Sequence, residues 1–490
     1  MKTRGLFLSA LLMGAVMASC SQDEVMNDAS EKSAKNSENY VAVNIVAPGG
    51  FGSRGADGGY ADGATGTNVA IDESKVSDAI FVFYDKDGGF VDVTNASLSS
   101  WADGTENTVD KVSSAVIVLS NPKTWPTQMV TLLNTGANLS AYRGVDLDEL
   151  LEKVGDYSST ESFVMSNSLY HDGNKEVTAT ALAETNIATT VEAAKTNPVQ
   201  VYVERVLAKV EADASEVEIK GVIDEEGKPV ETALDGEDVE FEVSIKGMAL
   251  VHTNPESYLI KNIASTPTWD GWNDATNFRS YWATSAASEE YETLSWSDVE
   301  NAKTVEEAIE YCHENTSATT TKLLVAAQFT ANGTYQTVFK FNGTYFTETG
   351  LKNYILNQYF GGTTVTVDDM SFVPATDENK KDWHVELKLA DTEHSDIVGS
   401  VNAKNISQWT DGMCYYYVDV EHFGPEGYDL GVVRNHWYKL TINSIAGLGT
   451  PVVDPDQPID PDKPEEENFY VAAQVNILKW KMVSQTVDLQ

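Results

Sequence analysis

One arginine near the N-terminus occupies a position where a protease could cut the chain. Arg54 lies in the stretch Pro48-Gly49-Gly50-Phe51-Gly52-Ser53-Arg54-Gly55, and its glycines make the backbone flexible and accessible. Directly before it, Tyr40-Val41-Ala42-Val43-Asn44-Ile45-Val46 alternates as a half-buried β-strand does. Hydrolysis of the bond between Arg54 and Gly55 would therefore detach one strand, with Val41, Val43 and Ile45 on its apolar face.

Cys20 is the second residue whose position suggests covalent chemistry. Basic Lys2 and Arg4 precede an apolar run of about twelve residues, which suits a secretory signal and is too short to span a membrane. The run ends in Met17-Ala18-Ser19-Cys20, which resembles a bacterial lipobox, whose cysteine becomes the lipidated first residue. An ordinary signal peptide with an incidental cysteine is the alternative. The polar residues 21–39 that follow predict a solvated leash.

No pattern in the chain indicates catalysis. The motifs of serine hydrolases, zinc proteases, P-loop enzymes and dinucleotide-binding enzymes are absent. The seven histidines are scattered, and we interpret His384 beside Trp383 and His436 beside Trp437 as strand residues rather than ligands. The stretch Asp85-Lys86-Asp87-Gly88-Gly89 has a calcium-like spacing without the distal glutamate, which favours a plain turn. We therefore expect no enzyme activity, metal or cofactor.

Two tryptophan-rich segments could bind sugars or pack a core. They are Trp269-Asp270-Gly271-Trp272 and Tyr281-Trp282. Aromatic rings stack on apolar surfaces, but most large aromatic side chains serve as core. We favour packing, and keep a glycan-binding surface lipoprotein as an alternative function.

Composition narrows the set of partners. The 490 residues carry 33 Lys and Arg against 75 Asp and Glu, a formal net charge of −42, which disfavours nucleic acid and anionic lipid as partners. No later apolar run approaches about 18 residues, so we expect membrane attachment through the lipid alone. Cys312 and Cys414 are expected to be buried thiols, with a disulfide between them as the alternative.

Short alternating segments predict a mainly β chain of two β-sandwich domains with few helices. We expect helices at Asp146–Val154 and, after a capping box at Thr304, at Val305–Glu314, with Cys312 on its apolar stripe. The domain break is expected near Lys246–Asn254. Strands are predicted at Ile80–Tyr84, Phe90–Val93, Val116–Leu119, Gln128–Leu133, Val199–Val210, Val239–Ile245, Lys322–Phe329, Thr337–Phe341, His384–Leu389 and Tyr415–Val420.

The C-terminus carries a second copy of the detachable strand. Val43-Asn44-Ile45-Val46 aligns without gaps on Val475-Asn476-Ile477-Leu478. A stretch with five prolines and seven acidic residues, from Gly447 to Glu467, precedes it and is expected to be extended. From Thr450 to Glu467 it could reach on the order of 55 Å. We interpret the final segment as a strand donated to another subunit. Its apolar face comprises Phe469, Val471, Ala473, Val475 and Ile477, and the pattern then shifts phase to Leu478, Trp480 and Met482, which suggests a bulge or a change of sheet.

Three further stretches resemble landmarks of a known family. Glu204–Val210, Leu132–Gly136 and Arg434–Asn443 are similar to segments of the Bacteroidales fimbrillins, the type V pilins. The proline-rich tether and the strand after it look most like the major, or shaft, subunit of the minor fimbrium. Ser21-Gln22-Asp23-Glu24 resembles the surface-export signal of Bacteroidales lipoproteins. The sequence departs from the family in its high content of Asp and Glu, and the loops 211–238 and 266–300 contain no recognisable family motif.

The resemblance implies two tandem transthyretin-like sandwiches, export as a palmitoylated lipoprotein of the outer membrane, and cleavage at Arg54 by an arginine-specific protease. It further implies assembly with copies of itself and with accessory subunits by donor-strand exchange, in a surface fimbrium that supports adhesion and virulence. An accessory or tip adhesin is the alternative within the family. The expected division is a signal at 1–20, a propeptide at 21–54, sandwiches at 55–248 and 249–447, a tether at 448–467 and a donor segment at 468–490.

Overall fold

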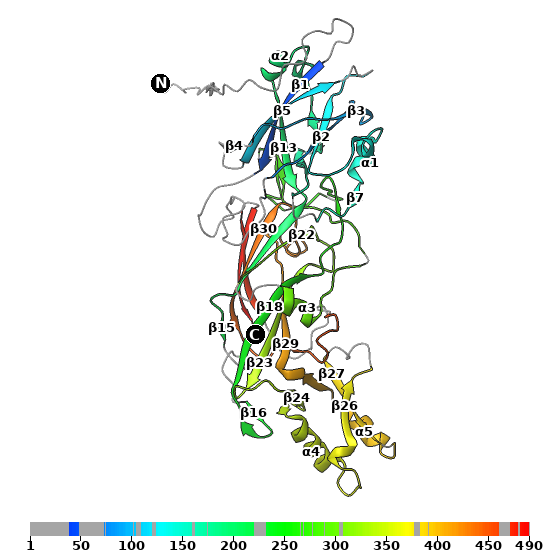
Figure 1. Ribbon diagram of the computed structural model, residues 1–490, viewed down its shortest axis with the longest axis vertical. Coiled ribbons are helices and arrows are strands. Elements are labelled where there is room, and N and C mark those ends of the chain that lie inside the picture. The colour runs from blue at the N-terminus through cyan, green and yellow to red at the C-terminus, as the bar shows by residue number, and fades with distance from the viewer. Residues whose placement is uncertain are drawn as a thin grey trace, which may run out of the picture. The chain divides into compact units, whose positions relative to one another are not determined.

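The chain folds mainly into β-sheets with a few short helices, as Figure 1 shows for the computed structural model. The structure describes residues 39–48, 73 and 75–489, with gaps at 101, 104–108, 120–123, 159–161, 174, 220–231, 265, 268, 277, 289, 303–306, 377–382, 391, 460–470 and 479–480. The sequence-based prediction of an all-β fold with few helices is confirmed. Within the described residues no helix is long and apolar enough to cross a membrane.

The first sheet runs in the order β3-β2-β6-β8-β13-β1-β5-β4, and β11 and β12 pair beside it. Strand β13 pairs with β1 on one side and with β8 on the other, so it joins two halves of the sheet. Side chains from both halves, such as Val43 and Phe81, meet in one core, as in a β-sandwich. The strands are β1 (Asn39–Pro48), β2 (Ala79–Tyr84), β3 (Phe90–Asn95), β4 (Ala102–Asp103), β5 (Val109–Leu119), β6 (Gln128–Leu133), β8 (Met165–Asn167), β11 (Thr180–Ala181), β12 (Ile187–Ala188) and β13 (Val199–Arg205).

Both faces of β2 are covered. Phe81 and Phe83 point into the core that contains β1, whereas Ile80, Val82 and Tyr84 contact a second cluster that includes Leu147 and Leu150 of helix α1 (Leu147–Leu151). This explains why β2 is buried along its whole length. The helix predicted at Asp146–Val154 is present, with Asp146 at its N-cap, and it ends earlier than expected. Helix α2 (Val191–Lys195) precedes β13.

Two later sheets pack across a single large core. One has the order β22-β14-β30-β32-β33, with β15 beside β30, and the other has the order β18-β23-β29-β31. Tyr438 and Leu440 from the first meet Val325 and Tyr416 from the second. The strands are β14 (Leu207–Asp213), β15 (Glu218–Ile219), β22 (Glu307–His313), β30 (His436–Ile445), β32 (Val471–Leu478), β33 (Lys481–Leu489), β18 (Phe241–Val251), β23 (Lys322–Ala331), β29 (Met413–Asp419) and β31 (Thr450–Pro451).

A seven-stranded sheet in the order β17-β16-β25-β24-β28-β27-β26 carries helices α4 (Glu348–Tyr359) and α5 (Ser395–Asn402). Leu351, Ile355 and Val401 from these helices pack on its core, and α3 (Trp296–Ala302) covers β18 and β23 elsewhere. The strands are β16 (Ala233–Leu234), β17 (Glu237–Asp238), β24 (Val338–Phe341), β25 (Thr344–Phe346), β26 (Met370–Pro374), β27 (His384–Leu389) and β28 (Ile406–Trp409). Short pairs join β7 (Val154–Gly155) to β19 (Ser257–Tyr258), β9 (Tyr170–Asp172) to β10 (Lys175–Val177), and β20 (Asn273–Asp274) to β21 (Arg279–Ser280).

The helix predicted at Val305–Glu314 is wrong, because most of this segment is strand β22. Leu207 to Asp213 of β14 pair with it residue by residue, in antiparallel register with His313 to Glu307. Ala308 and Cys312 lie in the core at a spacing that fits a helix and a strand equally well. The hydrogen-bonding edge of β14 decides the outcome, since a capping box is only a local preference that tertiary pairing can override.

The chain also changes sheets earlier than the sequence suggested. Val199–Val210 was expected to be one strand, but Val206 separates β13, in the first sheet, from β14, which pairs with β22 and β30. Residues Lys246–Asn254, where the domain break was expected, lie in β18 and directly after it, and β18 pairs with β23. Val206 itself is fully buried.

Cys312 and Cys414 are both buried and do not form a disulfide, in agreement with the expectation of two thiols. Both line the core between the two later sheets. Burial raises the pKa of each thiol far above its usual value, so neither is a reactive thiolate at neutral pH.

Candidate strand-exchange site

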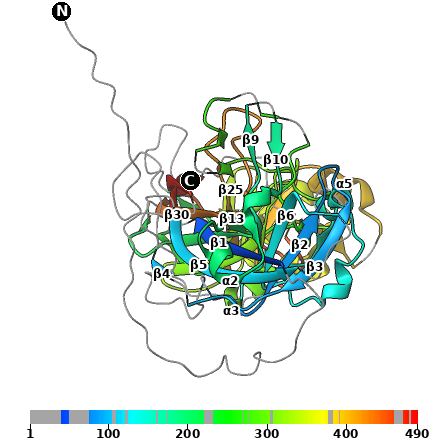
Figure 2. The same cartoon turned by 90° about the horizontal axis from the view of Figure 1, so that it is seen from above.

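Strand β1 lies inside the first sheet rather than at its edge, as the view in Figure 2 helps to follow. It pairs antiparallel with β5, from Asn39 opposite Leu119 to Pro48 opposite Val109, and parallel with β13, where Val43 is opposite Val199. A strand with a neighbour on each side leaves two unpaired edges if it is removed. We call the place that β1 occupies between β5 and β13 the β1 position.

The two faces of β1 differ in burial. Val41, Val43 and Ile45 are 0% exposed and belong to the core of the first sheet. Asn44 is half-buried on the other face, opposite Ser114 of β5 and Gln200 of β13. A register shift of one residue would turn Asn44 into the core, so the alternation of apolar and polar residues fixes the register of β1.

Glu73, which follows the expected cleavage site in the sequence, is anchored by hydrogen bonds to the body of the protein. Glu73 is buried, and its Oε1 accepts hydrogen bonds from Lys209 Nζ at 2.9 Å and Tyr311 Oη at 2.6 Å. Arg205 Nε donates to the Glu73 carbonyl at 3.1 Å. Burial alone would raise the pKa of Glu73, but the charges of Lys209 and Arg205 outweigh it and the pKa is lowered. None of these hydrogen bonds to Glu73 involves a residue of β1.

Several expected site residues lie outside the described part of the chain: Cys20, Arg54, Gly55, Phe469 and Trp480. Their processing and docking roles therefore stay predictions. For Val471, Ala473, Val475 and Ile477 the structure describes the backbone alone.

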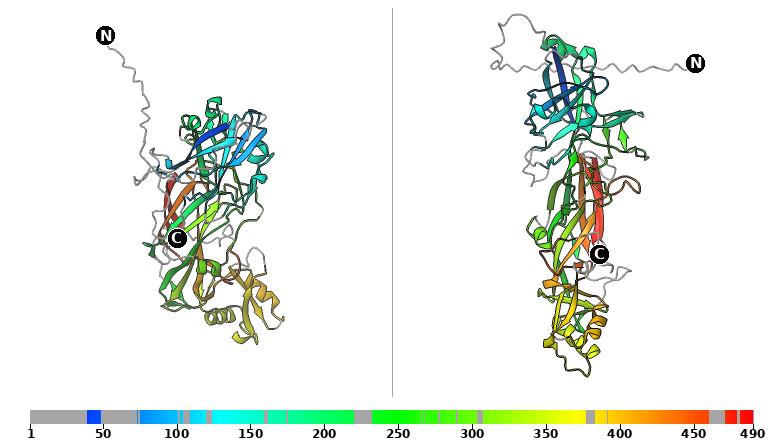
Figure 3. Two further views of the ribbon diagram at one scale, coloured as in Figure 1. Left: turned by 45° about the horizontal axis from the view of Figure 1, so that its top comes forward. Right: turned by 90° about the vertical axis from the view of Figure 1, so that its right-hand side faces the viewer.

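The C-terminal segment pairs within its own chain. Strand β32 runs antiparallel to β30, with Asn476 opposite Lys439, and β33 returns antiparallel along β32 (Figure 3). The phase shift after Ile477 was expected to mark a bulge or a change of sheet. Here it coincides with the end of β32 at Leu478, before β33 starts at Lys481.

The first half of the proline-rich stretch is attached to the body. Thr450 and Pro451 form β31 on β29, and Val452 N donates to the Met413 carbonyl. Ile459 N donates to the Leu294 carbonyl at 2.9 Å, and the Ile459 side chain is buried. The expected tether is therefore docked on the body as far as Ile459. The sequence alone did not reveal this docking.

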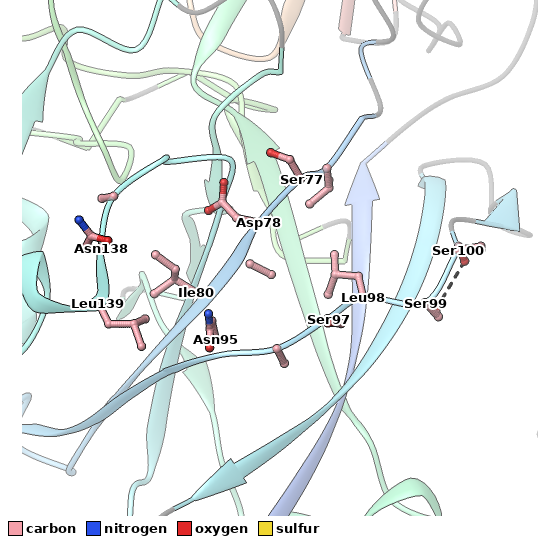
Figure 4. Close-up of a pocket in the computed structure, with 14 residues that line it drawn as sticks. Ser77, Asp78, Ile80, Asn95, Ser97, Leu98, Ser99, Ser100, Asn138 and Leu139 are labelled. Carbon is pink, nitrogen blue, oxygen red and sulfur yellow. Dashed lines mark hydrogen bonds between the residues drawn. The ribbon is translucent and has the colours of Figure 1, made fainter. Parts of the chain in front are cut away.

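A cavity of about 690 Å³ lies beside the start of β2. Figure 4 shows Ser77, Asp78 and Ile80 on one side of it, the segment from Asn95 to Ser100 on another, and Asn138 with Leu139 at its far end. The Ser99 amide donates to the Ser114 carbonyl at 2.8 Å, and Leu98 packs on the core that holds β1. Within the described residues Asp78 Oδ1 is buried there without a hydrogen-bond partner. The segment from Asn95 to Ser100 thus connects the cavity wall to β5.

Landmark residues of the sequence meet in a buried polar junction. Arg434 is fully buried, and donates from Nε and Nη2 to the two carboxylate oxygens of Glu314 at 2.8 and 2.7 Å. Lys261 Nζ donates to Glu204 at 2.8 Å, and Arg205 contacts Asn435. These contacts connect the end of β13 to the start of β30.

Burial and charge act in opposite directions within this junction. Burial would lower the pKa of Arg434, but the Glu314 carboxylate outweighs it and the pKa is raised. For Lys261 burial prevails over Glu204, and the pKa is lowered. No group of three or more metal-ligating side chains occurs in the part of the chain that the structure describes.

The tryptophans expected to pack or to bind sugars are engaged with protein. Trp282 is 8% exposed and packs on Val433 and Tyr428, and Trp272 contacts His171 edge-on at 5.0 Å. His384 and His436 are buried.

The C-terminal part of the chain is similar to a known protein family. Residues 407–486 match the family model described as the C-terminal part of fimbrillin, the type IV major fimbrial subunit protein. No curated protein matches the chain.

Two solved structures match most of the chain at low sequence identity. A candidate cell adhesion protein from Bacteroides eggerthii is 12% identical, with a TM-score of 0.36 over 92% of this chain and 97% of the other. The tip fimbrial protein Mfa3 from Porphyromonas gingivalis, C-terminally truncated, is 12% identical, with a TM-score of 0.33 over 90% and 99%. The matched residues 407–486 contain the landmark that begins at Arg434 and extend into β33. The family match is therefore confined to this C-terminal region, which is similar to the C-terminal part of the fimbrillins.

Proposed function

We propose that this protein is the shaft subunit of a surface fimbria, exported as a lipoprotein through Cys20 and cleaved after Arg54. Cleavage lets β1 leave, and the C-terminal segment of the next subunit takes the β1 position. Adhesion is then a property of the assembled fimbria, and the role of the chain is structural rather than enzymatic. Residues 21–54 act as the propeptide and residues 468–490 as the donated segment.

The central place of β1 in the first sheet carries this proposal. Its loss would expose the edges of β5 and β13 and the core around Val41, Val43 and Ile45 at once. Unpaired edges beside an apolar groove bind an extended strand readily. The anchor at Glu73 supports the same conclusion, because it holds the chain after the cleavage site when β1 is gone.

The sequence of the C-terminal strand fits the β1 position. Alignment of Val43-Asn44-Ile45-Val46 on Val475-Asn476-Ile477-Leu478 keeps apolar residues on the core side and an asparagine beside Ser114 and Gln200. In the single chain, β32 pairs with β30 instead. Assembly therefore requires the segment to leave its own sheet for that of a neighbour.

Cysteine crosslinking tests the exchange directly. Ser114 lies opposite Asn44 on the exposed face of β5, so Asn44→Cys with Ser114→Cys should form a disulfide within the uncleaved chain. After arginine-specific cleavage, Ser114→Cys with Asn476→Cys should crosslink neighbouring subunits into a ladder. A chain starting at Ser21 lacks Cys20, and the native thiols are buried, so they do not interfere.

Arg54→Ala in the Ser114→Cys, Asn476→Cys background is the matched control. It should keep the protein monomeric and prevent the intermolecular crosslink. A ladder in this uncleavable variant, or crosslinks of position 476 confined to its own chain, would refute the exchange.

A tip or accessory subunit is the alternative within the same family. A tip subunit receives a strand without donating one, whereas the segment after the tether argues for donation. Deletion of Phe469–Gln490 should abolish chain growth by a shaft subunit while leaving the cleaved first sheet able to accept a strand. Unchanged fimbria length after the deletion favours the tip assignment.

A further inference from the structure

A second cavity, of about 570 Å³, lies on the outer face of β13 beside the hairpin formed by β9 and β10. Strand β13 buries Val199, Val201 and Val203 in the core of the first sheet, so Gln200 and Tyr202 point to the opposite face. Both residues line the cavity, together with Phe278 from the loop between β20 and β21. This cavity is separate from the tryptophans considered as sugar ligands from the sequence.

Three aromatic rings form one wall. Tyr202 and Phe278 stack with their centroids 3.9 Å apart and their planes 15° from parallel, and Tyr170 meets Phe278 edge-on at 5.1 Å. All three side chains are half-buried. Because the stacked rings of Tyr202 and Phe278 cover each other's inner faces, an outer ring face of the pair serves as the flat apolar platform in this partly wet site.

The backbone at Phe278 is strained. Its φ is +51°, a left-handed conformation that is unfavourable for a bulky aromatic residue. The neighbouring pair β20–β21 and two hydrogen bonds between Asn273 and His171 hold the loop against β9. Strain of this kind concentrates at functional sites, where the surrounding structure enforces it. Here it positions the Phe278 ring on Tyr202.

Polar groups complete the cavity. Ser168 is 5% exposed and lines the cavity, and within the described residues its hydroxyl has no hydrogen-bond partner. The exposed amide of Gln200 and the half-buried amide of Gln128 are further lining groups, and Gln128 Nε2 already donates to the Asp85 carbonyl at 2.8 Å. A buried hydroxyl without a partner is costly unless a ligand or water supplies one.

The charges that line the cavity balance. The cavity is lined by two cations, Lys86 and Lys175, and two anions, Asp172 and Glu176, and Lys86 pairs with Asp87 at 2.5 Å. Balanced charge selects neither an anion nor a cation, and the net charge of −42 further disfavours acidic ligands.

We infer that this cavity binds a neutral saccharide, with a face of the pyranose ring on the Tyr202–Phe278 platform and its hydroxyls on Ser168 and the glutamine amides. A sugar ring has one apolar C–H face and a rim of hydroxyl donors and acceptors, which matches this combination of groups. A concave site of this size with a few polar groups is typical of small-ligand sites. The site does not depend on strand exchange, so it would operate in the single subunit as in the fimbria.

Saturation-transfer NMR on the chain from Ser21 tests the inference with methyl glycosides of glucose, galactose, mannose, N-acetylglucosamine and N-acetylgalactosamine. At least one glycoside should bind. Its affinity should not change between roughly 50 and 500 mM salt, because a neutral ligand is not held by charges that salt screens. Phe278→Asn should weaken it by about tenfold or more, equivalent to about 1.4 kcal/mol. Asparagine tolerates a positive φ, so this variant should fold at least as well as the parent, which thermal unfolding checks.

Tyr335→Ala is the control, because Tyr335 is an exposed aromatic residue that does not line the cavity. It should leave binding unchanged. The inference is overturned if none of the five glycosides binds, or if Phe278→Asn and Tyr202→Ala both retain full affinity. Binding confined to sialyllactose or to a proline-rich peptide would overturn it as well. None of these outcomes bears on strand exchange.

Discussion

Weakening β1 without altering the groove should accelerate assembly. Val43 is 0% exposed and contacts the core of the first sheet, and it leaves with β1 after cleavage. Val43→Ala removes two buried methyl groups at about 0.8 kcal/mol each, and the small cavity left behind brings the loss to about 2 kcal/mol. At about 1.4 kcal/mol per tenfold, the release of β1 should become about 30-fold faster.

Light scattering after addition of an arginine-specific protease measures the effect. If departure of β1 limits the rate, the lag before filaments appear should shorten by about the same factor as release accelerates. Asn44→Ala changes the same strand on its half-buried outer face and should have a much smaller effect. The uncleaved Val43→Ala protein should also lose about 2 kcal/mol of stability toward urea. Loss of that stability with no change in the rate of growth would contradict the displacement of β1.

The polar junction and the buried histidines give two further predictions. Arg434→Met should lower the free energy of unfolding in urea by about 3–5 kcal/mol, because Glu314 is left buried without a counter-charge. Adding Glu314→Leu should recover most of the loss. If the double variant is equally unstable, loss of the Arg434–Glu314 ion pair does not explain the destabilisation. Burial and the nearby positive charges lower the pKa of His436 well below 6.5, and burial lowers that of His313. Each therefore contributes stability that is present above pH 6.5 and is lost as the pH falls toward the folded-state pKa, by up to about 1.4 kcal/mol per pH unit. His436→Gln should flatten the decline of the urea midpoint between pH 7 and pH 5, and an unchanged slope would refute this assignment.

Local periodicity was enough to predict individual strands. Gln128–Leu133 and His384–Leu389 have the bounds expected from the sequence, because alternation and flanking turn residues are encoded within each segment. The apolar face of β1, with Val41, Val43 and Ile45 turned to the core, followed from the same alternation. The landmark at Arg434–Asn443, which resembles a fimbrillin segment, is one continuous stretch and lies within residues 407–486, which match the fimbrillin model.

The local sequence pattern did not predict which strands pair with each other. Glu307–His313 suits a helix or a strand, and only the edge of β14 makes it β22. Val206 separates two sheets although the residues around it form one apolar run. The sequence also did not indicate that Ile459 docks on Leu294, or that Phe278 reaches Tyr202 from a loop 76 positions away.

The sequence by itself determined many of the individual strands, the apolar face of β1, and which two strands resemble one another. Those properties depend on neighbours a few residues apart, where the side-chain period of a strand acts directly. Only the tertiary structure decided that β1 has a neighbour on each side, that Glu314 neutralises Arg434 from 120 residues away, and that three half-buried rings form one wall of a cavity. These are contacts between distant segments, and they form because burial and hydrogen bonding are satisfied for the whole chain at once.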